Sequence, residues 1–186
     1  MKYHFLLAAF FFILSKSDAQ FLLKPGGFVT SAGRDYYVIT VPGASQQQLF
    51  EAVERRIQTS FGSFRDRIAA DPGKEIVFQA TDRQGLNYYG KDYDVTFLAS
   101  FEFKDGKIKV NAPLIRSIRS FNPRTDSVAA VLSVNSPGAV IFLNRGYFVY
   151  DKKGKLKNPP LKELLESLVN DEILAPLLAV KTTEDW

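Results

Sequence analysis

The stretch that decides the fold is Asp94-Val95-Thr96-Phe97-Leu98-Ala99-Ser100-Phe101-Glu102-Phe103. Every second residue in it is apolar, and this is the period at which side chains alternate between the two faces of a β-strand. The pair Asp105-Gly106 follows and suits a two-residue hairpin turn, after which residues 107–110 return as the partner strand. The segment therefore predicts a β-hairpin with one face toward a core and the other toward water.

Two other segments have the apolar spacing of amphipathic helices. Ser45 and Gln48 have the spacing of a capping box at the start of the first helix. The apolar positions of this helix are Leu49, Phe50, Val53, Ile57 and Phe61. Asn158 before Pro159 is typical of a second helix start. The apolar positions behind it are Leu161, Leu164, Leu165, Leu168 and Val169, and Pro176 is expected to kink or restart this helix.

The rest of the chain is assigned by its β-prone runs and turn residues. Strands are expected at 36–41 and 75–80, and residues 139–143 and 147–150 are expected to form a second hairpin. Three prolines interrupt residues 113–137, and within this stretch residues 128–134 fit a strand or a helix equally well. Residues 20–35 are rich in glycine and turn residues, so we interpret them as a flexible leader before a single α+β domain over 36–186.

Residues 1–19 have the three-part pattern of an export signal. Lys2 precedes an apolar run over 5–14, and the small residues Ser17 and Ala19 fit a cleavage site after Ala19. A helix over 5–14 rises only about 15 Å, roughly half the hydrocarbon thickness of a bilayer. We therefore expect a cleaved signal peptide, a periplasmic or secreted protein, and no integral membrane segment after cleavage.

The composition excludes several kinds of catalysis. His4, inside the signal, is the one histidine of the chain, and there is no cysteine. The cleaved protein would lack the groups for a Ser-His-Asp triad, a Cys-His dyad or a His/Cys zinc site. The formal net charge of +4 is too small to indicate nucleic acid, which export also disfavours. We expect no cofactor and no metal, and a non-catalytic protein is favoured over an enzyme.

Two groups of residues are candidate binding sites. The first could stack on a sugar or a peptide and consists of Arg83, Asn87, Tyr88, Tyr89 and Tyr93. The alternative for it is a hairpin loop whose tyrosines cover the end of the core. The second is basic and could bind an anion: it consists of Arg116, Arg119 and Arg124, with a further basic cluster of lysines at 152, 153, 155 and 157. The alternative here is a solvated basic surface.

A hydrolase of an envelope polymer is the alternative function. Its acid and base would come from Asp92, Asp94 and Glu102. Such chemistry needs two carboxylates about 5 to 9.5 Å apart across a cleft. Asp92 and Asp94 could also face one side and hold calcium, but no calcium-binding loop pattern surrounds them, so we interpret them as solvated loop carboxylates.

Three stretches together resemble a known family. They are Tyr36-Tyr37-Val38-Ile39-Thr40-Val41-Pro42-Gly43 running into Gln48-Leu49-Phe50, then Phe101-Glu102-Phe103-Lys104-Asp105-Gly106-Lys107-Ile108, and Val149-Tyr150-Asp151-Lys152-Lys153-Gly154-Lys155-Leu156. They resemble a bacterial family of exported proteins, a domain of unknown function with a TATA-binding-protein-like fold, over roughly residues 36–175. The resemblance implies a curved antiparallel sheet with two long amphipathic helices on one face, and it carries over no catalytic residue.

These observations favour an exported binding or interaction module of the cell envelope. Its partner would be an envelope protein, a peptide or a glycan, bound by the exposed sheet face or by the tyrosine loop.

The predicted export signal can be tested directly through its cleavage site. Intact-mass spectrometry of the protein from its native cells should find a chain that begins at Gln20, because cleavage follows Ala19. A cytosolic product that keeps Met1 would overturn the assigned compartment.

Overall fold

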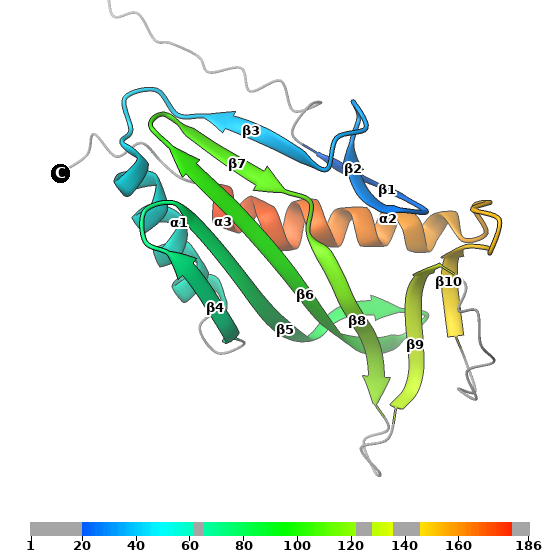
Figure 1. Cartoon of the computed structure of the whole chain (residues 1–186). Helices are drawn as coiled ribbons and strands as arrows, with labels where there is room; N and C mark the ends of the chain where they lie inside the picture. The colour runs from blue at the N-terminus through cyan, green and yellow to red at the C-terminus, as the bar shows by residue number, and fades with distance from the viewer. Residues whose placement is uncertain (1–19, 62–64, 122–127, 136–145, 180–186) are drawn as a thin grey trace, which may run out of the picture.

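The computed structural model of the protein describes residues 20–61, 65–121, 128–135 and 146–179. In this part of the chain, strands and helices combine as an α+β protein, which confirms that part of the fold prediction (Figure 1). The strands are β1 (Phe21–Lys24), β2 (Gly27–Thr30), β3 (Tyr36–Thr40), β4 (Arg65–Asp71), β5 (Glu75–Tyr88), β6 (Lys91–Lys104), β7 (Lys107–Asn111), β8 (Leu114–Phe121), β9 (Val128–Asn135) and β10 (Gly146–Tyr150). The helices are α1 (Gln46–Phe61), α2 (Pro159–Ser167), the π-helix η1 (Leu168–Leu174) and α3 (Ala175–Leu178).

Strand β6 is the centre of the larger sheet. One edge of β6 pairs with β5 along its length, whereas β8 and β7 share its other edge. The sheet order is β10-β9-β8-β6-β5-β4, and β7 joins β6 to β3. Every second residue of β6 from Tyr93 to Phe103 is buried. The predicted alternation and the β6–β7 hairpin are therefore confirmed.

The turn between β6 and β7 also holds the start of α1. Gly106 has a φ of 68°, the left-handed conformation that its position in the turn requires. The Asp105 carboxylate accepts a hydrogen bond of 2.8 Å from the backbone N–H of Gln46, the first residue of α1. Ser45 and Gln48 bond reciprocally, at 2.8 and 3.3 Å, so the predicted capping box is confirmed.

The helices pack behind the sheet in the view of Figure 1. All five predicted core positions of α1 are buried. Asn158 caps α2 as predicted, because its side chain accepts from the N–H of Leu161. The C-terminal helical region is divided: the π-helix η1 follows α2, and the helix restarts as α3 around Pro176, as predicted. Pro176 lies in the first turn of α3, and the N–H of Ala175 bonds to the carbonyl of Asn170, a π-type spacing that the α-helix does not have.

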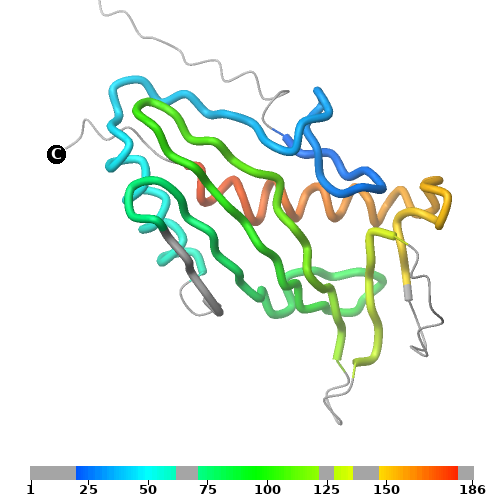
Figure 2. The backbone as a smooth tube through the Cα atoms, viewed as in Figure 1, coloured from blue at the N-terminus to red at the C-terminus, as the bar shows by residue number. Residues whose placement is uncertain are grey.

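Residues 20–35 differ from the predicted flexible leader. Strands β1 and β2 form an antiparallel hairpin, with Phe21 paired to Thr30. Phe21 and Leu23 are fully buried, and Phe28 is nearly so. The partners of this hairpin lie at the other end of the sequence, so local composition could not reveal them. Figure 2 shows the hairpin beside the C-terminal helices.

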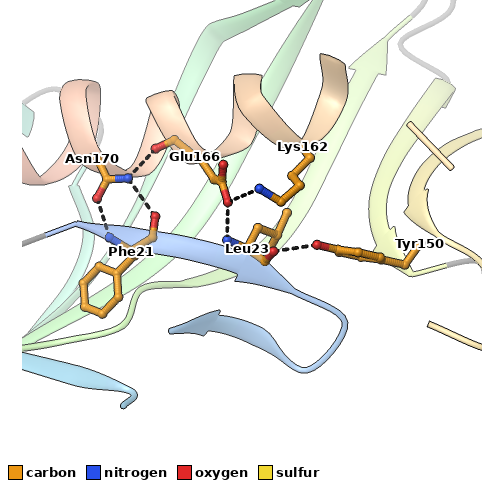
Figure 3. Close-up of polar contacts among 6 residues, drawn as sticks. All are labelled: Phe21, Leu23, Tyr150, Lys162, Glu166 and Asn170. Atoms are coloured by element: carbon orange, nitrogen blue, oxygen red, sulfur yellow. Dashed lines mark hydrogen bonds and ion pairs between the residues drawn. The ribbon is translucent and has the colours of Figure 1, made fainter. Parts of the chain in front are cut away.

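The outer edge of β1 is satisfied by side chains of the C-terminal region (Figure 3). The Asn170 amide accepts from the N–H of Phe21 and donates to its carbonyl, both at 2.9 Å. Glu166 accepts from the N–H of Leu23 at 2.6 Å, and the Tyr150 hydroxyl donates to the Leu23 carbonyl at 2.5 Å. Four backbone groups that would otherwise be unpaired on a strand edge are thereby satisfied. We call these contacts the terminal clasp.

Residues 113–137, after β7, could not be assigned from the sequence. They contain β8 and β9, which pair in an antiparallel manner. Strand β10 pairs with β9 in parallel. Residues 139–143, the other half of the predicted second hairpin, lie outside the described residues, as does the predicted signal peptide at 1–19. Among the described residues, no helix has both the length and the apolar character needed to cross a bilayer.

The terminal clasp can be tested by removing one side chain. Asn170→Ala leaves the N–H and carbonyl of the buried Phe21 unpaired, so we expect a loss of about 1–3 kcal/mol in the free energy of unfolding. Urea unfolding measures this loss, and hydrogen exchange should show faster exchange at Phe21. Asp171→Ala is the control, because Asp171 is exposed on the same helix. Equal stability of the two variants would contradict the role assigned to Asn170.

Candidate functional site

Three tyrosine rings meet at the far end of the β5–β6 hairpin. Tyr88 ends β5, Tyr89 follows it, and Tyr147 comes from β10. The ring centroids are 4.6 Å apart for Tyr88 and Tyr89, 5.4 Å for Tyr88 and Tyr147, and 5.8 Å for Tyr89 and Tyr147. Such spacings are typical of favourable aromatic contacts. We call these three residues the tyrosine cluster.

Tyr89 occupies an unfavourable backbone conformation. Tyr88 pairs with Lys91, so Tyr89 and Gly90 form a two-residue turn, and their φ angles are 50° and 68°. Turns with two positive φ angles normally take Asn-Gly or Asp-Gly, and a left-handed conformation costs a bulky residue about 1 kcal/mol. Tyr89 is nevertheless 75% exposed. A strained backbone thus presents an aromatic ring to solvent, which is a feature typical of ligand-binding positions.

Tyr88 connects the cluster to the start of α2. It is 7% exposed, and its hydroxyl accepts a hydrogen bond of 2.7 Å from the Asn158 amide. The same Asn158 side chain caps α2 by accepting from the N–H of Leu161. Burial raises the pKa of the Tyr88 phenol, and the hydrogen bond from Asn158 lowers it in part. The cluster is therefore held by strand, turn and helix together.

The structure assembles only part of the predicted tyrosine site. Tyr88 and Tyr89 lie together, whereas Tyr93 is fully buried in the core under β6. Arg83 is exposed in an irregular part of β5, where the pairing with β6 shifts between Asp82 and Leu86. Asn87 donates a hydrogen bond of 2.8 Å to Asp92 across the hairpin. Tyr147 was missed because it lies on another strand, far along the chain.

The carboxylates of the alternative function are engaged in separate contacts. Asp92 accepts from Asn87, and Asp94 accepts from the backbone N–H of Gln84 at 3.0 Å. Glu102 bonds to Lys109 at 2.6 Å, and this hydrogen bond is the main reason that its pKa is lowered. Eight residues of extended strand separate Asp94 from Glu102, which is roughly 26 Å. The described residues contain no cluster of three His, Cys, Asp or Glu side chains suited to a metal ion.

The open face of the sheet is a second candidate surface. Lys109 is central to it, because its ammonium lies 4.9 Å from the ring centroid of Tyr36 and bonds to Glu102. Asn111 donates to Ser100 at 3.1 Å and to Glu102 at 3.3 Å. The polar groups on this face therefore bond to one another. The ring of Tyr89, by contrast, is exposed to solvent.

The predicted anion site is divided by the structure. Arg116 and Arg119 are exposed on β8, and Arg119 pairs in register with Asp94 of β6. Arg124 lies outside the described residues. In the basic turn after β10, the Asp151 carboxylate accepts from the backbone N–H groups of Lys153 and Lys155, both at 2.9 Å. These contacts shape the turn.

Comparisons with known proteins found only structural neighbours. No family model matches the chain, and no curated protein matches it. A TBP-like protein from Parabacteroides distasonis is 15% identical, with a TM-score of 0.40 over 49% of this chain and 58% of its own. A DUF4468 family protein from Bacteroides ovatus is also 15% identical, with a TM-score of 0.47 over 79% of this chain and 86% of its own.

The buried phenol of Tyr88 should make the stability of the protein depend on pH in the alkaline range. Because the folded state raises this pKa, the neutral phenol stabilises the fold fully below about pH 10, and this contribution is lost as the pH rises through the folded-state pKa. Tyr88→Phe has no proton to lose there, so its stability should fall less steeply above pH 10. Urea unfolding between pH 8 and about 11 measures both slopes. Identical slopes would contradict the burial of the phenol.

Proposed function

We propose that this protein is an exported, non-catalytic binding module of the cell envelope, and that its tyrosine cluster binds a glycan. The observation that carries the proposal is Tyr89, a ring that is 75% exposed although its backbone is strained. A ring with no role at this position would be replaced at a gain in stability by Asn or Gly.

The chemistry of the cluster suits a sugar. The exposed ring of Tyr89 offers a flat apolar surface for the C–H face of a pyranose. The phenolic hydroxyls of the cluster can bond to sugar hydroxyls, and the Asn158 amide holds that of Tyr88 in place. The contacts of Tyr89 with Tyr88 and Tyr147 hold the ring in place before binding, which reduces the entropy lost on association.

Sequence and geometry support the other parts of the proposal. The pattern of residues 1–19 supports export to the periplasm or the exterior, where envelope glycans are found. The separate contacts of Asp92, Asp94 and Glu102 support binding without catalysis. We also propose that the fold is TATA-binding-protein-like, with a curved sheet and the helices on one face; the packing of the helices behind the sheet supports this.

The proposal is tested on a glycan array with the purified protein and two single variants. Tyr89→Ala should weaken binding about tenfold, which corresponds to one stacked ring at about 1.4 kcal/mol. Asn111→Ala is the control, because it removes a side chain from the open sheet face without changing β3 and should leave binding unchanged.

Two outcomes would contradict the proposal. Binding that is lost in Asn111→Ala but kept in Tyr89→Ala would place the site on the open sheet face. If the parent protein binds no glycan on the array, its ligand is not a glycan.

A further inference from the structure

Strand β3 has an unpaired edge whose orientation follows from its pairing with β7. The N–H of Ala112 bonds to the carbonyl of Asp35, and the N–H of Val41 bonds to the carbonyl of Gly106. Both pairs belong to the register that β3 keeps with β7. In an antiparallel ladder, hydrogen-bonded pairs recur at every second residue. The backbone groups of Tyr37 and Ile39 therefore point toward β7.

The backbone groups of the alternate residues point the other way. Tyr36, Val38 and Thr40 direct three N–H and three carbonyl groups away from β7. Within the described ranges, no strand pairs with this side of β3 and no backbone hydrogen bond reaches these residues. The edge is thus a row of strand-pairing groups without a partner strand.

The composition of β3 does not protect this edge. Its sequence, Tyr-Tyr-Val-Ile-Thr, contains no charged residue, no proline and no glycine, and Val38 is 48% exposed. Proteins usually prevent pairing at an open edge with charges, proline or bulges. Two other strand edges of this protein have backbone groups that are satisfied: the terminal clasp satisfies β1, and the backbone N–H groups of Lys157 and Asn158 donate to the carbonyl of Val149 in β10. The edge of β3 differs from these two.

We propose that this edge pairs with β3 of a second copy of the chain, in an antiparallel manner about Val38. In that register Val38 lies opposite Val38 of the other copy, and Tyr36 lies opposite Thr40, which gives about six backbone hydrogen bonds. No charge of β3 opposes the approach. On the adjacent strand, Lys109 pairs in register with Val38, and its ammonium is neutralised by Glu102 at 2.6 Å.

The dimer would leave the tyrosine cluster of each copy accessible. The cluster lies at the β5–β6 turn, and Figure 1 shows that turn at the opposite end of the sheet from β3. The dimer itself does not depend on the proposed glycan function. Where both hold, two clusters on one particle bind a polymer with higher avidity than one.

The oligomeric state tests the proposal. Five residues per copy make a small interface, so we expect a dissociation constant of roughly micromolar order. Light scattering and analytical ultracentrifugation between about 1 and 200 µM should show a monomer that becomes a dimer. Val38→Lys places two ammonium groups opposite each other and should stay monomeric. Val38→Thr is the matched control and should dimerise like the parent.

Engineered cysteines test the register, because the natural sequence has none. Val38→Cys places two Cα atoms about 5.5 Å apart in the dimer, which suits a disulfide, so it should cross-link on oxidation. Thr40→Cys is the control, because its two copies would lie roughly 13 Å apart and should not cross-link.

Several results would overturn the proposal. A parent protein that is monomeric at about 200 µM would do so, as would a Val38→Lys variant that dimerises like the parent. Equal cross-linking of the two cysteine variants would also do so. The cross-linking result keeps the test decisive even if Val38→Lys fails to fold.

Discussion

The burial of one face of β6 is the constraint on which the rest of the structure depends. Its rings contact those of neighbouring elements: Phe97 lies 5.8 Å from Phe78 and 5.7 Å from Phe61 of α1, and Phe103 lies 5.6 Å from Phe50. Because β6 pairs with β5 on one edge and with both β7 and β8 on the other, its register positions all of them. The turn at one end of β6 fixes the start of α1, and the turn at the other end presents Tyr89.

Side-chain hydrogen bonds join the two ends of the described chain. Asn170, Glu166 and Tyr150 bond to the backbone of β1 where a neighbouring strand would otherwise be needed. The π-helical segment contains Asn170, so the irregular helix and the strand edge are parts of one arrangement. The edge of β3 differs from that of β1, because in the described part of the chain no strand or side chain pairs with its outward backbone groups.

Sequence reasoning succeeded where the signal was local. The alternation of β6, the capping box at Ser45 and the Asn158 cap each depend on residues within a few positions of one another. It failed where partners are distant, because the hairpin at 20–35 is recognisable only beside Asn170 and Glu166. The candidate site divides in the same way: Tyr88 and Tyr89 were identified from their local sequence, whereas Tyr147 joins them only through the fold.

Native-state hydrogen exchange, followed residue by residue by NMR, tests the central role of β6 most directly. The amides of Val95, Phe97 and Phe101 should exchange only through global unfolding, because these residues are buried in a strand paired on both edges. Exchange of these amides at the rate of the amides of Tyr89 and Gly90, in the exposed turn between β5 and β6, would contradict this account.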